Sequence, residues 1–221
     1  MNRLLTLLFS IFSLSAIGQN FDYNKHFAPL LEVTKDSTSE YFYQSLLEKF
    51  EKADTSMTDV EVLIMMIGYT SQPNYKPYSK LDLERNILQL VADKKYNIAL
   101  DSCNMLLQTN PLNFTALTEK GYCTWKLNLE TAELDRTKVL KIISAIKYSG
   151  KGTVEDPYFV LGPSDGQVLI KYFWGGKIGQ MGSGECEGAN FCDILECISD
   201  DGTSTSLYFN IEHASQTMFD K

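Results

Sequence analysis

The chain has 221 residues, of which 44% are hydrophobic and 22% are charged, and its formal net charge is −8. These proportions are typical of a soluble globular protein of one or two domains. They exclude a disordered tail, a collagen-like fibre and a polytopic membrane protein. The acidic excess argues against a nucleic-acid partner, because phosphate groups are neutralised by clustered Lys and Arg. It also argues against adsorption to anionic lipid.

The first residues have the pattern of a secretory signal peptide. An apolar run over residues 4–14 follows the positive Arg3, and Ala16 and Gly18 supply the small residues before a cleavage point. We therefore expect residues 1–18 to be removed and the mature chain to be periplasmic or secreted. The apolar run is shorter than the roughly 20 residues that span a bilayer. We expect no stable membrane insertion after cleavage.

Residues 19–149 are predicted to be a helical region. Thr58–Glu61 is a capping box at the start of a helix over Val60–Tyr69, which is apolar all round and should be the buried centre of this region. Ser37–Glu40 has the same pattern and predicts a helix that begins near Tyr41. The last helix is predicted over residues 131–148, where apolar residues recur on one face.

The middle of the helical region is similar to a tetratricopeptide-like helical hairpin. The matching positions are Leu83, Leu90, Ala99 and Pro111. A second copy, displaced by roughly 34 residues, continues at Leu117 and fails at Glu133. One and a half copies cannot form an independent solenoid, so we expect these helices to pack on neighbouring elements.

Residues 150–221 are predicted to be an antiparallel β region, because glycine and β-forming residues become frequent there. The expected strands are 158–161, 168–174, 177–181, 191–199 and 207–211, with hairpin turns at Gly175-Gly176 and at Asp200–Gly202. The fold class is therefore α+β, with helices first and a β-meander packed on them. A sheet of this size should share one composite domain with the helices.

Several short segments resemble one family. They are a GY-x2-Q-x2-Y-x-PY motif at 68–78, the turn at 149–153, Cys192-Asp193 and the strand at 207–211. Together they resemble the DUF4919 family of exported bacterial proteins over almost the whole mature chain. Lys151 departs from the Ser-Gly-Asp-Gly turn of that family, which alters a turn. The family has no assigned function, so the resemblance implies no catalytic residues.

The cysteines predict one structural disulfide. Cys186 and Cys192 flank a short glycine-containing loop and are the expected pair, as disulfides form in exported proteins. Cys103 and Cys123 lie on predicted helices, where a buried free thiol is the usual state. The cysteine spacings do not match zinc pairs and the chain has only two histidines. We predict no metal site and no cofactor.

One string fits a hydrolase motif. Residues 162–166 read G-x-S-x-G around Ser164, and Asp193 and His213 follow in the order of the α/β-hydrolases. That motif needs a helix after the serine, and the sequence there is interpreted as a strand, so we favour an ordinary turn. Asp193 and Glu196 are an odd number of residues apart on a predicted strand and should point to opposite faces.

A tyrosine-rich connection is the predicted binding site. Tyr69, Gln72, Tyr75 and Tyr78 surround two prolines, and aromatic faces with polar tips suit a peptide or a sugar. The alternative is a connection whose rings pack against the preceding buried helix. Packing of this kind is the commoner role of such rings.

These patterns predict an exported, non-enzymatic binding or protein-interaction module. Its partner would be a protein, a peptide or a glycan of the cell envelope. Two alternatives remain open: an envelope hydrolase that uses Ser164 or Asp193, and a structural component of an envelope assembly.

Overall fold

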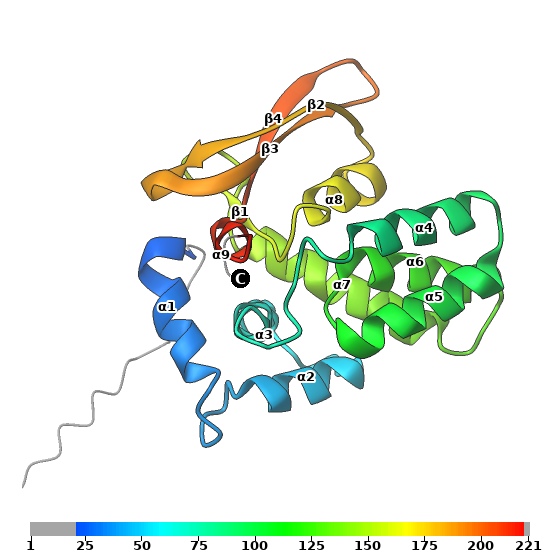
Figure 1. The fold of residues 1–221 in the computed structure, drawn as a ribbon, viewed down its shortest axis with the longest axis horizontal. Coiled ribbons are helices and arrows are strands. Elements are labelled where there is room, and N and C mark those ends of the chain that lie inside the picture. Colours follow the sequence, from blue (N-terminus) through cyan, green and yellow to red (C-terminus); the bar gives the residue numbers. More distant parts are fainter. Residues whose placement is uncertain (1–20, 219–221) are drawn as a thin grey trace, which may run out of the picture.

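The computed structural model describes residues 21–218. The predicted signal peptide, residues 1–18, lies outside the described residues. The first part of the described chain is helical. Its elements are α1 (Tyr23–Val33), α2 (Tyr43–Glu51), α3 (Asp59–Tyr69), α4 (Leu81–Ala92), α5 (Tyr96–Thr109), α6 (Phe114–Lys126) and α7 (Ala132–Tyr148) (Figure 1).

Helix α3 is the buried centre of this part, as predicted. The Thr58 hydroxyl accepts a hydrogen bond from the Glu61 backbone N–H, and the Glu61 carboxylate accepts one from the Thr58 N–H at 2.8 Å. This reciprocal capping satisfies two backbone donors that the helix cannot satisfy itself. Residues 62–69 are all buried, and α1, α2 and α7 pack around them (Figure 1).

The second predicted capping box is wrong. Helix α2 begins at Tyr43 without a side-chain cap. Upstream, the Ser39 hydroxyl accepts a hydrogen bond from the Tyr41 N–H, and the Asp36 carboxylate accepts one from the Thr38 N–H. These short polar side chains hydrogen-bond to nearby backbone groups and so stabilise turns in place of a helix.

The tetratricopeptide-like character is not confirmed. Helices α4 to α7 do lie side by side in chain order, each in contact with the next (Figure 1). Ala99 is fully buried, as a close helix approach requires, but Leu83 is 46% exposed. Ala99 therefore fits the small-residue position of the repeat, whereas Leu83 is not buried as its leucine position requires.

The second part contains the sheet. Its elements are β1 (Tyr158–Phe159), α8 (Asp165–Phe173), β2 (Lys177–Cys186), the 3-10 helix η2 (Glu187–Ala189), β3 (Asn190–Ile198), β4 (Ser204–Asn210) and α9 (Glu212–Gln216). The strand order is β1-β4-β3-β2. The β2–β3 and β3–β4 pairs are antiparallel, and β1 pairs with β4 in parallel, with Tyr158 opposite Phe209. The fold is α+β, as predicted, with a parallel edge strand added to the meander.

The predicted strand over 168–174 is wrong, because this segment is helix α8. Its apolar run is only a few residues long, and such runs fit a buried strand or a buried helix equally well. Gly166 allows α8 to lie on the sheet, since a Cβ there would be 2.8 Å from the Phe209 ring. Helix α8 lies between the sheet and α6 (Figure 1).

The predicted hairpin turn at Gly175-Gly176 is also wrong. Gly175 has a φ of 68° and follows the end of α8, where left-handed glycine commonly terminates a helix. A Cβ on Gly176 would be 2.3 Å from the Cys197 sulfur on β3. The two glycines therefore turn the chain from α8 into β2 and let it approach the sheet closely.

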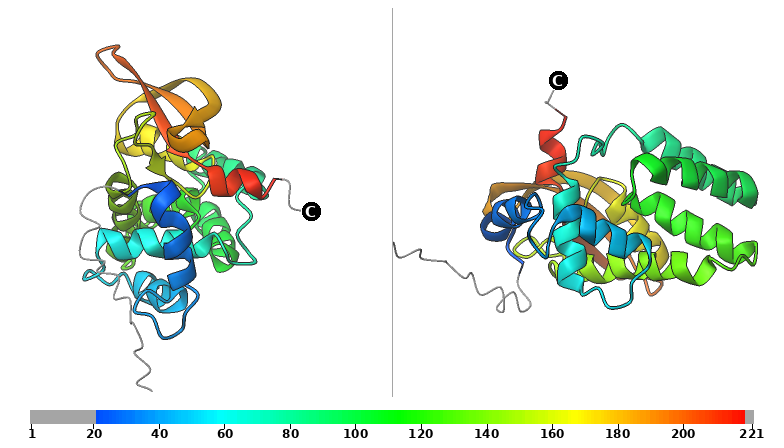
Figure 2. Two further views of the ribbon diagram at one scale, coloured as in Figure 1. Left: turned by 90° about the vertical axis from the view of Figure 1, so that its left-hand side faces the viewer. Right: turned by 90° about the horizontal axis from the view of Figure 1, so that it is seen from below.

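Helices α1 and α9 come from opposite ends of the described sequence and contact each other in the fold (Figure 2). The His213 ring of α9 stacks on Phe27 of α1 and on Phe159 of β1, with centroid distances of 5.6 and 4.7 Å. Most buried apolar side chains of the helices and of the sheet belong to one hydrophobic cluster, and a smaller cluster lies among α4, α5 and α6. Within residues 21–218, no helix has the length and apolar character needed to cross a membrane.

Candidate functional site

The tyrosines of the predicted binding site point into the protein. Tyr69 and Tyr75 are 4% and 7% exposed, and their rings meet edge to face at 5.5 Å. The Tyr69 hydroxyl donates to the Asn110 side chain at 3.1 Å, and the Tyr75 hydroxyl donates to the Leu161 carbonyl at 2.6 Å. Both phenols are therefore used to join this connection to neighbouring elements.

The other two residues of this prediction lie at the edge of the same region. The Gln72 amide donates to the Gly68 carbonyl at 3.3 Å. Tyr78 is half-buried, and its hydroxyl has no hydrogen-bond partner among the described residues. The adjoining hollow has a volume of about 30 Å³, which is room for water and not for a peptide or a sugar. That this connection binds a ligand stays a prediction.

Beside the tyrosines lies a buried carboxyl group. One oxygen of Asp165 accepts hydrogen bonds from the backbone N–H groups of Leu161 and Gly162, at 2.8 and 3.0 Å. Burial, together with the nearby Glu84 and Asp193 carboxylates, raises the pKa of Asp165 to about 7, although the two N–H groups act in the opposite direction. The group fixes the turn that leads into α8.

The hydrolase motif has its strand, turn and helix, contrary to our reading of the sequence. Ser164 nevertheless has ordinary right-handed angles, φ −77° and ψ −24°, rather than a strained elbow. His213 is buried among aromatic rings, and burial lowers its pKa to about 3. Burial likewise raises the pKa of Asp193 to about 6. No hydrogen bond joins Ser164, Asp193 and His213 anywhere in the described chain.

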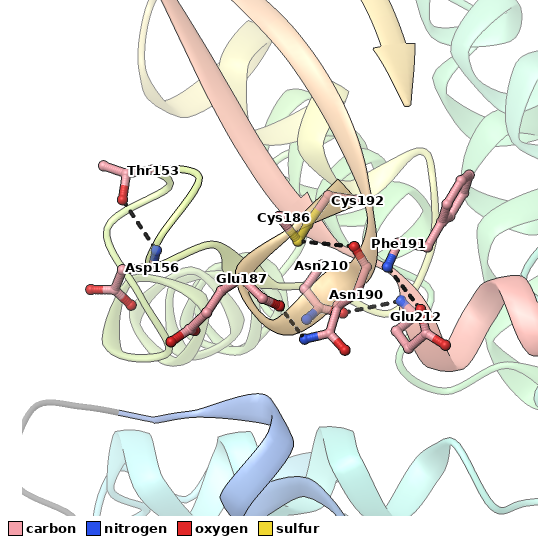
Figure 3. The surroundings of a disulfide bond; sticks show 9 residues. All are labelled: Thr153, Asp156, Cys186, Glu187, Asn190, Phe191, Cys192, Asn210 and Glu212. Atoms are coloured by element: carbon pink, nitrogen blue, oxygen red, sulfur yellow. Dashed lines mark hydrogen bonds between the residues drawn. A yellow bond between two sulfur atoms is a disulfide. The ribbon is translucent and has the colours of Figure 1, made fainter. Parts of the chain in front are cut away.

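Figure 3 shows the cysteine pair. A disulfide joins Cys186 to Cys192 and closes the β2–β3 hairpin around η2. The Asn190 amide donates to the Glu187 carbonyl at 2.7 Å inside this loop, and the Phe191 N–H donates to the Glu212 carboxylate at 2.8 Å (Figure 3). The three other cysteines are buried free thiols. The disulfide closes this end of the hairpin, and the Phe191–Glu212 hydrogen bond joins it to α9.

A much larger hollow lies elsewhere, among the helices. It has a volume of about 830 Å³ and is lined by α4, the α4–α5 connection, the first residue of α5, α6, α7 and the end of α8. We call it the aromatic groove, since Tyr96, Tyr122, Trp125 and Tyr172 line it. Its volume falls in the range of sites that enclose small ligands, about 300–1,000 Å³.

The rings of the aromatic groove are accessible. Trp125 is 60% exposed, Tyr122 is 39% exposed and Tyr172 is 40% exposed. Tyr122 lies 5.8 Å from Trp125 and 6.0 Å from Tyr96, between ring centroids. The Lys126 ammonium group lies 4.3 Å from the Trp125 ring centroid. Large exposed aromatic surface of this kind marks recognition sites more often than scaffolding.

A buried carboxyl group lies in the lining of the aromatic groove. Glu119 is 2% exposed, and its Oε1 has no hydrogen-bond partner in the described chain. Burial raises the pKa of Glu119, while the Tyr172 hydroxyl and the Lys171 ammonium group act in the opposite direction. The Thr118 hydroxyl, also in the lining, is another buried group without a partner. Each unpaired group costs about 1–3 kcal/mol of stability.

A second hollow of about 260 Å³ lies beside the aromatic groove, between α4 and α8. Leu88, Lys171 and Tyr172 line both hollows. Glu84 lines the second one and is 6% exposed. One Glu84 oxygen accepts a hydrogen bond from the Asn113 amide at 2.5 Å, and the other has no partner among the described residues.

The aromatic groove was not predicted from the sequence. Its lining comes from five helices, and each helix alone has the pattern of an ordinary amphipathic segment. One signal was available: Tyr122 and Trp125 are three residues apart on a helix and therefore share a face.

Comparison with known proteins gives one match. The family model described as a domain of unknown function, DUF4919, matches residues 30–219. No curated protein and no solved structure matches the chain. The matched segment covers the tyrosine connection, the aromatic groove and the whole sheet.

Proposed function

Because the chain belongs to the DUF4919 family, a domain of unknown function, we propose its role from its own geometry: an exported, non-enzymatic binding protein whose ligand lies in the aromatic groove. The observation that carries the proposal is the combination of exposed rings with a buried, unpaired acceptor at Glu119. A protein that only needed a core would gain stability by covering these rings and pairing this oxygen.

Export is part of the proposal and rests on the signal-peptide pattern of residues 1–18. The disulfide between Cys186 and Cys192 supports it, because such bonds persist in oxidising compartments. A binding role is preferred to hydrolysis, since no hydrogen bond in the described chain joins the Ser164 hydroxyl to a base, including the Asp165 and Asp193 carboxyl groups, whose pKa values are raised.

The two tryptophans of the chain allow a direct test of the groove. Trp125 lines the aromatic groove, whereas Trp174 packs against Tyr158 and Phe209 at 5.3 and 6.2 Å. Each gives one indole N–H signal in a nitrogen-15 NMR spectrum, and Trp125→Phe assigns them. The chain from residue 19 onward would be titrated with a panel of neutral and acidic oligosaccharides, decapeptides and aromatic small molecules.

We expect at least one probe to shift the Trp125 signal in a saturable way and to leave the Trp174 signal in place. A panel that leaves the Trp125 signal unmoved would refute the groove as a binding site. Shifts of both signals together would indicate a change of the whole fold and count equally against it.

A further inference from the structure

We infer that the aromatic groove takes an uncharged oligosaccharide. This inference rests on the proposed function and adds the chemical class of the ligand. It follows from the shape of the two hollows, from the charges that line them, and from the polar atoms left unpaired in their lining.

The shape indicates an extended ligand. The aromatic groove, about 830 Å³, and the second hollow, about 260 Å³, share Lys171 and Tyr172 as common lining. A ligand that occupied both hollows would contact the lining at Trp125 in the first and at Ser164 in the second. An oligomeric chain fills two such hollows better than a single compact molecule.

The carboxylate oxygens without partners in the lining would accept hydrogen bonds from a ligand. Glu119 lines the first hollow and Glu84 the second, and each has one carboxylate oxygen without a partner in the described chain. A ligand that donates hydrogen bonds at two separate points would satisfy both oxygens. Sugar hydroxyl groups do so at intervals along a chain, and the Thr118 hydroxyl can pair with another of them.

The charges in the lining favour an uncharged ligand that donates hydrogen bonds. The basic residues Arg85, Lys94, Arg136 and Lys171 line the two hollows together with the acids Glu84, Glu119 and Glu133, so the charge of the lining is nearly balanced. Lys171 belongs to both hollows and would repel a basic peptide on its path. Its ammonium group lies 4.8 Å from the Tyr172 ring centroid, and the Lys126 ammonium group lies over the Trp125 ring in the same way, at 4.3 Å. Cations therefore already lie over these rings, which disfavours a cationic ligand.

The exposed rings suit the remaining surface of a sugar. A pyranose has a face of C–H groups that packs flat on an aromatic ring while its hydroxyls reach polar neighbours at the edge. Trp125 is 60% exposed and Tyr172, which lines both hollows, is 40% exposed, so each ring keeps free surface beside the lysine that lies over it.

The test uses the Trp125 indole signal with neutral oligosaccharides of glucose, xylose, mannose and N-acetylglucosamine, each from two to six sugars long. We expect at least one series to bind, and its affinity to rise with length as the second hollow fills. Trp125→Ala and Glu119→Gln should each weaken binding about tenfold, followed by calorimetry.

Two controls match these variants. Met105→Ala removes an equally exposed apolar side chain outside the groove, and Glu48→Gln changes an exposed acid on α2. Both should bind like the parent chain. The Trp174 signal of each variant reports whether the fold is intact.

The outcomes separate the two proposals. If decapeptides shift the Trp125 signal and no oligosaccharide does, the sugar inference is overturned and the groove remains a binding site. If oligosaccharides bind but Trp125→Ala and Glu119→Gln bind them as the parent chain does, the groove is not where they bind. A silent Trp125 signal with every probe overturns both.

Discussion

The tyrosine connection and the aromatic groove contain the same kinds of side chain and use them in opposite ways. In the connection, Tyr69 and Tyr75 are buried and donate to Asn110 and Leu161, and the remaining hollow is about 30 Å³. In the groove, Trp125 is exposed beside a hollow of about 830 Å³. The difference shows that aromatic and polar content alone does not mark a site. Tyr78 in the connection and Glu119 in the groove both have a polar atom without a partner, but only the groove adds exposed rings and room for a ligand.

The largest expected effect is on the tyrosine connection. Tyr75→Ala should lower the free energy of unfolding by about 3–5 kcal/mol, because it removes a buried ring and leaves a cavity. It also removes the donor to the Leu161 carbonyl. Urea unfolding followed by circular dichroism measures this. A loss below about 1 kcal/mol would mean that the connection is not scaffolding and would reopen it as a ligand site.

The second effect concerns pH and the Asp165 carboxyl group. Its pKa is about 7 in the fold and 3.8 for an ordinary aspartate, so the folded state holds the proton that the unfolded state releases. This contribution is fully present below about pH 4 and is lost as pH rises to about 7, by at most about 4 kcal/mol. Asp165→Asn keeps an acceptor for Leu161 and Gly162 and removes the charge.

We therefore expect Asp165→Asn to be more stable than the parent chain at pH 8 and to lose that advantage near pH 4. The difference between the two urea-unfolding curves, taken at several pH values, isolates this group from Asp193 and His213. Asp101→Asn, an exposed acid on α5, is the control and should show no such trend. A difference that does not change with pH would contradict the assignment.

The smallest expected effect is on the groove. Trp125→Ala should change the free energy of unfolding by less than about 0.5 kcal/mol, since an exposed side chain contributes little to the core. The same urea experiment applies, with Met105→Ala for comparison. A loss as large as that of Tyr75→Ala would show that Trp125 is structural and would erase the contrast between the two regions.

Helix α3 was predictable and helix α8 was not. For α3, the Thr58–Glu61 capping box and a long apolar run point to the same element, and the structure has it. For α8, the apolar run Val168–Ile170 is short, and whether it forms a strand or a helix depends on the sheet it packs against. Tertiary contacts determine the secondary structure of this segment, and they cannot be derived from the local sequence pattern.

The candidate site was harder to predict than the fold. The connection from Tyr69 to Tyr78 is continuous in sequence, and so its rings were visible as a cluster. The aromatic groove brings Glu119 and Tyr172 together from segments about fifty residues apart, which only the packing of α6 against α8 defines. Nothing local distinguishes Glu119 from a solvated glutamate on a helix.

The parallel pairing of β1 with β4 has a consequence for the order of folding. Tyr158 must wait for Phe209, which is synthesised about fifty residues later. The helices can form from local contacts well before that, but the edge strand cannot pair while β4 is incomplete. The helical part therefore presents uncovered apolar surface until β4 has been made, and a chain shortened before β4 would keep that surface exposed.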